Sequence, residues 1–536
     1  MHTTKKIKSE VRQIFDLLTE SDGVGKNKSL EIPGVDAAMK KSPSTSNTVE
    51  YEFSDIESED SVYEESNLNV TNTSVRKELA EWAVKFNIST VATSSLLGIL
   101  QKYIRDIPKD ARTLKCTPKI PPIEKMGTGE YIHYGIEDSL TDFLLRKSFD
   151  FTEIHLNINI DGLPLAKSSN LQAWPILINV NGEPVVMVVG AYCENSKALC
   201  PNIFLQRFVD ELLYLLEHGL NFNGKHFSIY CRSFICDAPA RSYVLGVKGH
   251  TGFFCCIKCT QKGESVGHRI IFRSEIYPNR TVADFRSRSN VNHHKILNQI
   301  AIEKLPIDIV KSLPYDYMYV VCLGVMKSLL LGWIRHKNRL YSLKPDQINS
   351  LNSKILFLSN QVPKEFARHP RTLQEIERFK ATELRQFLLY TGIVLLADIL
   401  DAERYNHFLL LSLGMRILLN ETSCIENNEC AKIRLSEFVK NISRLYDDSF
   451  LTFNFHCLTH LHSDALNYGG LESISAFKFE TFLFKLKHKC NSKSHIAAQI
   501  YNRLVEESLF SNDNFEVANV KQNQPMKYQF ILKNAR

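Results

Sequence analysis

The sequence predicts an α/β fold, in which a mixed sheet core is interrupted by a large all-α insertion. Three observations lead to this prediction. Residues 151–240 alternate between strand-like and helix-like patterns. Residues 307–448 then show apolar spacing typical of helices, with no strand-like punctuation. Residues 1–74 mix Lys, Ser, Asn and acidic runs with few large apolar side chains, which is typical of a disordered segment.

The segments expected to form the core follow the order strand, strand, strand, helix, strand. The strands are predicted at EIHLNINID (153–161), AWPILINV (173–180), PVVMVVGAYC (184–193) and HFSIYCRSFICDA (226–238), and the helix at FLQRFVDELLYLLEHGL (204–220). NGEP forms the turn between the second and third strands. This order is that of a ribonuclease-H-like core, in which a parallel crossover strand extends an antiparallel hairpin.

The remaining sequence divides into segments by composition. Residues 75–109 show helical spacing with a break at AsnIleSer, so two helices are expected there. The expected organisation is a disordered segment 1–74, a helical module and linker 75–150, the first part of the core 151–250, a zinc-ligand segment and all-helical insertion 251–455, the completion of the core 456–510, and a tail 511–536.

Charge is unevenly distributed along the 536 residues. The formal net charge is +6, but residues 50–66 contain eight acids and no Lys or Arg, so the rest of the chain carries +14 (6 + 8). A basic balance of this size permits a polyanionic partner such as nucleic acid.

The cysteines and the apolar segments argue against secretion and against a membrane span. The chain has thirteen cysteines, an odd number, and no apolar stretch near its first residues, which is typical of a reducing compartment. The longest apolar stretch, residues 317–334, contains Lys327 and is followed by RHKNR. We therefore expect a buried helix there, and no membrane partner.

Three acids occupy positions that suggest metal-dependent chemistry. Asp161 and Asp237 each end a predicted strand, and Glu480 lies in the predicted helix SAFKFETFLFKLKHK. Parallel neighbouring strands would bring the two aspartates together across 76 residues of sequence. Carboxylates suit two Mg²⁺ or Mn²⁺ ions, which support phosphodiester cleavage. Glu472 is the nearest alternative if Glu480 points away.

A second metal site is predicted around a CxxC motif. Cys256 and Cys259 have the spacing of half a tetrahedral zinc site. Three sources for the other half are open at this point. They are the local His250 or His268, the pair His293 and His294, and the remote pair His456 and His460, whose i,i+4 spacing puts both rings on one helical face. Such a zinc ion would be structural.

Four motifs together resemble a known family. IDGLPLAKSSNLQAWPIL, CDAPARSYVLGVKGHTGFFCCIKC, LPYDYMYVVCLGVMKSLL and HCLTHLHSDALNYGGLESISAFKFETF are similar to segments of the CACTA (En/Spm)-related DDE transposases, in the broader group with Transib and the V(D)J recombinase catalytic subunit. The resemblance covers roughly residues 75–510. One departure is at Met318-Tyr319, where the family pattern has Met-His.

The resemblance implies a function and assigns roles to residues. It implies a ribonuclease-H-like core with a DDE triad, an insertion before the glutamate, and a CxxC motif paired with histidines. Carried over by motif, the triad is Asp161, Asp237 and Glu480, and the zinc ligands are Cys256, Cys259, His456 and His460. It further implies double-stranded DNA as the partner (transposon ends and target), nuclear location and assembly as a homo-oligomer.

Basic residues near the triad are candidate contacts to DNA phosphates. They are Lys167 after Asp161, Arg241 after Asp237, and Lys485 and Lys489 after Glu480. The alternative is a solvated basic face with no partner.

Three functions fit these features. The first is a transposase that cuts DNA and transfers a strand. The second is an inactive, domesticated relic that binds DNA or protein in the nucleus, and the third is a nuclease of the same fold without transposition.

Overall fold

In the computed structural model, the residues that can be described belong to the unit Glu65–Arg536. The described residues are 66–146, 149–165, 170–198, 200–275, 277–335, 341–362, 366, 368–490, 492 and 494–511. Residues 1–65 of the predicted disordered segment 1–74, and residues 512–536 of the predicted tail 511–536, lie outside the described residues.

The centre of this unit is a mixed sheet. Its order is β1-β2-β6-β5-β3-β8-β7, with β4 paired to β5. All of its strand pairs are antiparallel except β3 with β8, which is parallel. The strands are β1 (Ile123–Met126), β2 (Gly129–His133), β3 (Glu153–Ile160), β4 (Leu163–Pro164), β5 (Gln172–Val180), β6 (Val186–Glu194), β7 (Leu220–Phe222) and β8 (Lys225–Ile235). The predicted α/β class and the four predicted strands are confirmed.

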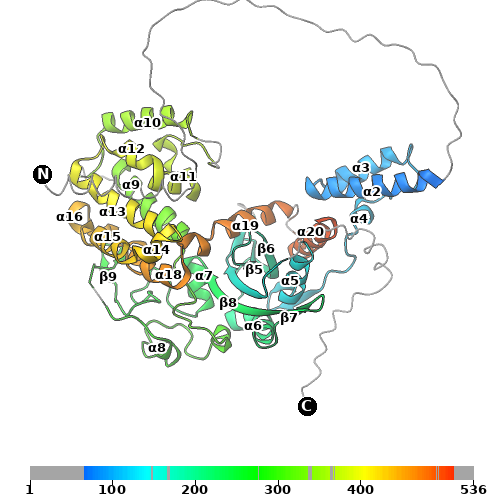
Figure 1. The fold of residues 1–536 in the computed structure, drawn as a ribbon, viewed down its shortest axis with the longest axis horizontal. Coiled ribbons are helices and arrows are strands. Elements are labelled where there is room, and N and C mark those ends of the chain that lie inside the picture. Colours follow the sequence, from blue (N-terminus) through cyan, green and yellow to red (C-terminus); the bar gives the residue numbers. More distant parts are fainter. Residues whose placement is uncertain are drawn as a thin grey trace, which may run out of the picture. The chain divides into compact units, whose positions relative to one another are not determined.

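Helix α6 (Pro201–His218) covers one face of this sheet (Figure 1). Phe208 of α6 packs edge-on against Phe234 of β8, with ring centroids 6.5 Å apart. Phe234 is paired with Ile158, so the apolar residues of β3 share the α6 face. Since side chains alternate along a strand, Asn157 and Asn159 point to the opposite face. Asp161, just beyond the end of β3, continues this row of polar side chains.

The hairpin β1–β2 corrects the predicted linker. A Pro- and Lys-rich linker is predicted at these residues. The structure instead has a two-residue turn, in which Gly127 has φ +61° and Met126 pairs with Gly129. Strand β2 then extends the sheet beside β6, and Tyr131 is fully buried in it. Pairing to an existing sheet edge stabilises a strand whose own sequence gives little signal.

Two helices precede the hairpin, as predicted, but the first begins earlier. Helix α2 spans Ser66–Lys85, so it includes residues expected to be disordered, and α3 spans Thr90–Leu100. Helix α4 (Ala111–Leu114) completes the group, and α2 also packs against the C-terminal helix α20 (Ile496–Ser511). Ala80, Leu97, Ile107 and Leu114 form the buried core of this module.

The segment between Asp237 and Glu480 is mostly helical. A short hairpin of β9 (Glu264–Val266) and β10 (Arg269–Ile271) shows that residues 251–455 are not all-helical. Its three-residue strands are too short to produce a periodic signal. The helices are α7 (Ala238–Val244), α8 (Val282–Arg286), η1 (Ala301–Lys304), η2 (Met318–Met326), α9 (Lys327–Arg335), α10 (Pro345–Ser359), η3 (Leu373–Arg378), α11 (Ala381–Gln386), η4 (Phe387–Thr391), α12 (Gly392–Leu396), α13 (Ala402–Leu419), α14 (Ser423–Glu426), α15 (Asn428–Lys440), α16 (Ile442–Leu445), η5 (Asp448–Phe450), α17 (Phe453–Cys457), η6 (Leu458–His460), α18 (Leu461–Tyr468) and η7 (Leu471–Ile474). Helices α5 (Ile136–Leu144) and α19 (Phe477–Lys489) pack against the sheet.

The apolar stretch is a helix inside the protein, as expected. Among the described residues, Met318–Arg335 is the one helix with the length and composition of a membrane span, and 61% of this window is buried within the structure. Its first part, η2, has π-helical geometry and packs against α17 and α11.

The close packing of η2 on α17 depends on Gly324. A Cβ atom at this position would lie 2.5 Å from Asn454 Nδ2 and 2.9 Å from Asn454 Cβ.

We predict that Gly324→Ala lowers the free energy of unfolding by about 1–3 kcal/mol, because the two helices must separate. Gly98→Ala in α3 is the matched control, because nothing lies within 4 Å of a Cβ there. It should stabilise the protein by roughly 0.5–1 kcal/mol. Equal changes in the free energy of unfolding for Gly324→Ala and Gly98→Ala, measured by urea unfolding, would contradict this account.

Candidate metal centres

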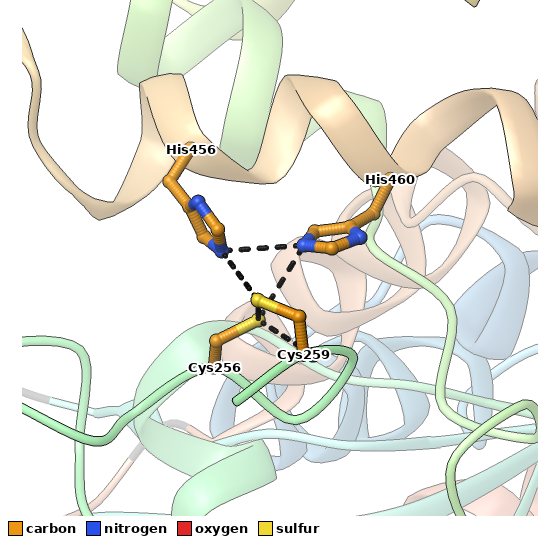
Figure 2. A group of neighbouring side chains, drawn as sticks. All are labelled: Cys256, Cys259, His456 and His460. Carbon is orange, nitrogen blue, oxygen red and sulfur yellow. Dashed lines mark hydrogen bonds between the residues drawn. The ribbon is translucent and has the colours of Figure 1, made fainter. Parts of the chain in front are cut away.

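Four side chains from two distant segments form a buried cluster (Figure 2). Cys256 and Cys259 come from the loop after α7, and His456 and His460 point toward them from α17 and η6. Their ligand atoms all lie within 4.8 Å of one another. The Sγ atoms are 3.6 Å apart and the two Nε2 atoms 3.2 Å. Cys259 Sγ is 3.4 Å from His456 Nε2, and Cys256 Sγ is 3.6 Å from His460 Nε2.

These separations match the edges of a zinc coordination tetrahedron. Zinc binds sulfur at about 2.3 Å and nitrogen at about 2.0–2.1 Å, so neighbouring ligand atoms should be about 3.3–3.8 Å apart. The observed 3.2–3.6 Å is close to that range. Two thiols and two imidazoles are also the donor set that zinc prefers. The cluster can therefore hold a metal ion such as zinc, as predicted.

The surroundings of Cys256 favour its thiolate. Burial opposes ionisation, but a hydrogen bond from Cys259 and the charges of His456 and His460 outweigh burial, and the pKa of Cys256 is held well below its usual range. The Cys259 backbone N–H also points at Cys256 Sγ, at 3.4 Å. The thiolate is the form of cysteine that binds metals.

The other histidines weighed from the sequence lie outside this group. His293 and His294 are buried beside each other, with ring centroids 5.0 Å apart, and His293 Nδ1 contacts the Phe254 carbonyl. His250 and His268 are exposed. The remote pair therefore completes the cluster.

A buried ion pair fixes the cluster to the helices around it. Lys258, between the two cysteines, donates to Asp464 Oδ1 at 2.8 Å, and the Asp464 side chain is fully buried. Asp464 Oδ2 accepts from the Tyr315 N–H at 2.9 Å. Removing one partner of such a pair leaves a buried charge uncompensated, at a cost of about 3–5 kcal/mol.

The register of the sheet brings the two predicted aspartates together. Strands β3 and β8 are parallel, and their last pair is Asn159 with Ile235. Asp161 and Asp237 each follow two residues later, so they are neighbours at the same end of the sheet. Asp237 also caps α7, accepting from the Ala240 N–H at 2.6 Å.

Glu480 approaches the same end of the sheet from the first turn of α19. The Tyr319 hydroxyl donates to Asp161 Oδ2 at 2.9 Å and also contacts Glu480 Oε1. Burial, followed by the charges of Asp237 and Glu480, raises the pKa of Asp161 to about 8. Burial also raises the pKa of Asp237. The three carboxylates therefore need positive charge, which protons or a divalent cation can supply.

The carboxylate group is more open than the Cys/His cluster. Among the described residues, only the Cys/His set brings three or more ligand atoms within 4.8 Å of one another. The carboxylates are linked instead through Tyr319. A hydroxyl has one proton and can donate to one carboxylate at a time. Tyr319 stands where the family pattern has a histidine, and its hydroxyl lies between two of the predicted ligands, Asp161 and Glu480.

Asp316 positions Tyr319 and α19 together, and sequence reasoning did not identify it. Its Oδ2 accepts from the Tyr319 N–H at 2.9 Å, and its Oδ1 accepts from the Ala476 N–H at 2.8 Å. The side chain is buried, which raises its pKa to about 6. An acid in LPYDYM with apolar neighbours is the one signal that could have marked it.

Glu472, the alternative to Glu480, lies elsewhere. It accepts a hydrogen bond from the Tyr317 hydroxyl at 2.6 Å and pairs with Arg385 at 3.2 Å. No contact joins it to Asp161 among the residues described.

The predicted DNA contacts are placed in different environments. Arg241 is buried, with its guanidinium 4.6 Å from the Tyr315 ring centroid and bonded to the Cys236 carbonyl, so the prediction of a phosphate contact is wrong for this conformation. Lys489 is paired with Glu507, and burial lowers its pKa to about 8. Lys485 is exposed. Lys167 lies outside the described residues.

Comparison with known proteins identifies no relative. No protein-family model matches the chain, and no curated protein matches it. The resemblance to DDE transposases therefore stays a prediction.

We predict that the purified chain binds about one zinc ion and that Cys256→Ser loses it, because one of four ligands is removed. Cys255→Ser is the matched control, since Cys255 is an equally buried neighbour outside the ligand group. Zinc content by mass spectrometry and the Tm of each variant are the readouts. Equal zinc in wild type and Cys256→Ser would refute the assignment.

Proposed function

We propose that this chain is a transposon-derived DDE transposase, a metal-dependent DNA endonuclease and strand-transfer enzyme acting on transposon ends. The observation that carries this proposal is the approach of Asp161, Asp237 and Glu480 to one end of the sheet. They come from segments separated by 76 and 243 residues, and burial, followed by the charges of the other two, raises the pKa of Asp161. Perturbed acids gathered in this way are typical of functional sites.

We also propose that the core is ribonuclease-H-like, with the segment between Asp237 and Glu480 as its insertion. The antiparallel set β6-β5-β3, the crossover helix α6 and the parallel strand β8 support this topology. The predominance of helices between residues 318 and 474 supports the insertion.

The carboxylates fit two Mg²⁺ or Mn²⁺ ions. Their oxygens are the hard ligands that these ions prefer, and a cation would offset both the burial and the repulsion that raise the pKa of Asp161. When bound, two such ions activate an attacking oxygen and stabilise a leaving oxygen. Asp161, Asp237 and Glu480 would hold the ions.

The chain's own residues hold this geometry in place. Asp161 Oδ1 accepts from the Gly162 N–H at 2.7 Å, which leaves Oδ2 toward Tyr319 and Glu480. In the proposed first reaction, a water oxygen bonds to phosphorus and loses a proton to solvent, the bond from phosphorus to the 3′ oxygen breaks, and the leaving 3′ oxygen takes up a proton to become a hydroxyl. In the second, the freed 3′ hydroxyl attacks a target phosphodiester, so one P–O bond replaces another.

The partners and location follow from the same proposal. The substrate would be double-stranded DNA, the location nuclear and the assembly a homo-oligomer. No membrane partner is proposed.

One observation favours the alternative of an inactive relic that binds DNA or protein. The Tyr319 hydroxyl lies between Asp161 and Glu480, where the resemblance would place a metal ion. Cleavage activity separates the two possibilities.

We predict that the protein nicks DNA carrying candidate terminal repeats in Mg²⁺ or Mn²⁺, and that Asp161→Asn lowers the rate by at least about 100-fold. Loss of a group that merely orients a metal ligand costs about 10–100-fold, and loss of a ligand should cost more. Mn²⁺ should also raise the Tm of wild type and not that of the variant, because only a bound ion stabilises the folded state.

Asp210→Asn is the matched control for this experiment. Asp210 is an exposed acid on α6, which covers the opposite face of the sheet. It should nick like wild type. Equal activity of wild type and Asp161→Asn would reject the role of Asp161, and nicking without joined products would favour a nuclease of the same fold.

Tyr319→Phe tests the hydroxyl that joins Asp161 and Glu480. We predict that the Mn²⁺ concentration for half-maximal nicking rises about 10-fold, since groups that orient metal ligands typically contribute 10–100-fold in affinity. The maximal rate should change less. A lower Mn²⁺ requirement would show instead that Tyr319 blocks the site.

A further inference from the structure

A groove of about 700 Å³ lies along α19, the helix that carries Glu480, and it is lined by no residue of the triad or of the Cys/His cluster. Three elements form it. They are the β5–β6 turn at Pro184–Val186, the helical segment between Phe366 and Gln386, and α19. It therefore lies where the helical insertion meets the sheet core.

The groove carries excess positive charge. Its lining includes the four cations Arg368, Arg385, Lys478 and Lys485 and a single acid, Glu472, which gives a formal charge of +3 (4 − 1). Glu472 is already engaged by Tyr317 and Arg385.

Three of the cations have no ion-pair partner among the described residues. Lys478 donates to the neutral Asn179 side chain at 2.7 Å. Arg368 and Lys485, both exposed, make no ion pair with any residue that the structure describes. Unpaired cations in a concave surface attract a polyanion.

The rest of the lining suits the other parts of a nucleotide. Phe477 and Phe482 of α19 provide aromatic surface, and Thr382 and Thr481 provide hydroxyl groups. Cations that track a phosphate backbone, together with aromatic side chains that stack on bases, are the combination used to bind single-stranded nucleic acid. A volume of 700 Å³ is that of a small-molecule site, which suits a few unpaired nucleotides rather than a duplex.

The groove is also joined to the carboxylates. Lys478, Thr481 and Lys485 are spaced by three and four residues, so they share one face of α19, and Glu480 projects from the same helix. On the insertion side, Tyr317 contacts the groove residues Glu472 and Arg385, and Tyr319, two residues later, contacts Asp161. A strand in the groove would thus be separated from Glu480 by about the diameter of one helix, ~10 Å.

We infer that this groove binds an unpaired DNA strand next to the position of cleavage, an inference that rests on the proposed function. Arg368 and Lys485 contact its phosphates, and the phenylalanines of α19 contact its bases. The strand becomes unpaired when the duplex opens at the site of reaction.

Binding without added divalent ion tests this inference separately from catalysis. Fluorescence anisotropy would compare a labelled 12-nucleotide DNA strand with its duplex, for wild type and the double variant Arg368→Ala/Lys485→Ala. Both residues are exposed, so the fold should be unaffected. We expect at least about 10-fold weaker binding of the single strand, with a salt dependence reduced by about 1.4, or 0.7 for each lost phosphate contact. Duplex binding should change less.

Lys440→Ala, an exposed lysine on α15 outside the groove, is the matched control and should bind like wild type. Unchanged single-strand affinity in the double variant would overturn the inference, and so would an equal loss for strand and duplex. If wild type nicks DNA but the double variant binds normally, the groove assignment fails while the proposed function stands. If the double variant loses binding but wild type never nicks, the proposed function fails alone.

Discussion

The structure depends on the contact between the Cys256 loop and the helix that carries His456 and His460. These two segments are about 200 residues apart in sequence, and their four ligand atoms approach to tetrahedral spacing. A bound metal ion of zinc's size would join the two ends of the helical segment at a single point. Because the cysteines follow Asp237 closely and the histidines precede Glu480 closely, this closure brings both ends of the intervening helical segment to the sheet.

Two buried carboxylates, neither of them a predicted metal ligand, fix the positions of the segments that meet at the Cys/His cluster. Asp464 joins the CxxC loop, through Lys258, to the backbone before η2. Asp316 then joins the start of η2 to the start of α19. Each acid uses both of its oxygens, so neither can be removed without leaving buried donors unpaired. Together they set where Tyr319 and Glu480 stand relative to Asp161.

Sequence reasoning predicted the parts that depend on local periodicity. The alternation in β3 and the position of Asp161 at its end are visible in the sequence, and the i,i+4 spacing marked His456 and His460 as one of three candidate sources for the other half of the zinc site. It missed the β1–β2 hairpin, whose strands are stabilised by the sheet rather than by their own residues. It could not predict the burial of Arg241 or the contacts of Tyr319, because both arise from packing between segments far apart in sequence.

The central claim is that Asp161, Asp237 and Glu480 form a divalent-metal site separate from the Cys/His cluster. Anomalous diffraction from crystals grown with Mn²⁺, recorded on both sides of the manganese and zinc edges, tests it most directly. We expect manganese to be bound by Asp161, Asp237 and Glu480, and zinc by the four-ligand cluster. Manganese absent from the carboxylates would contradict it.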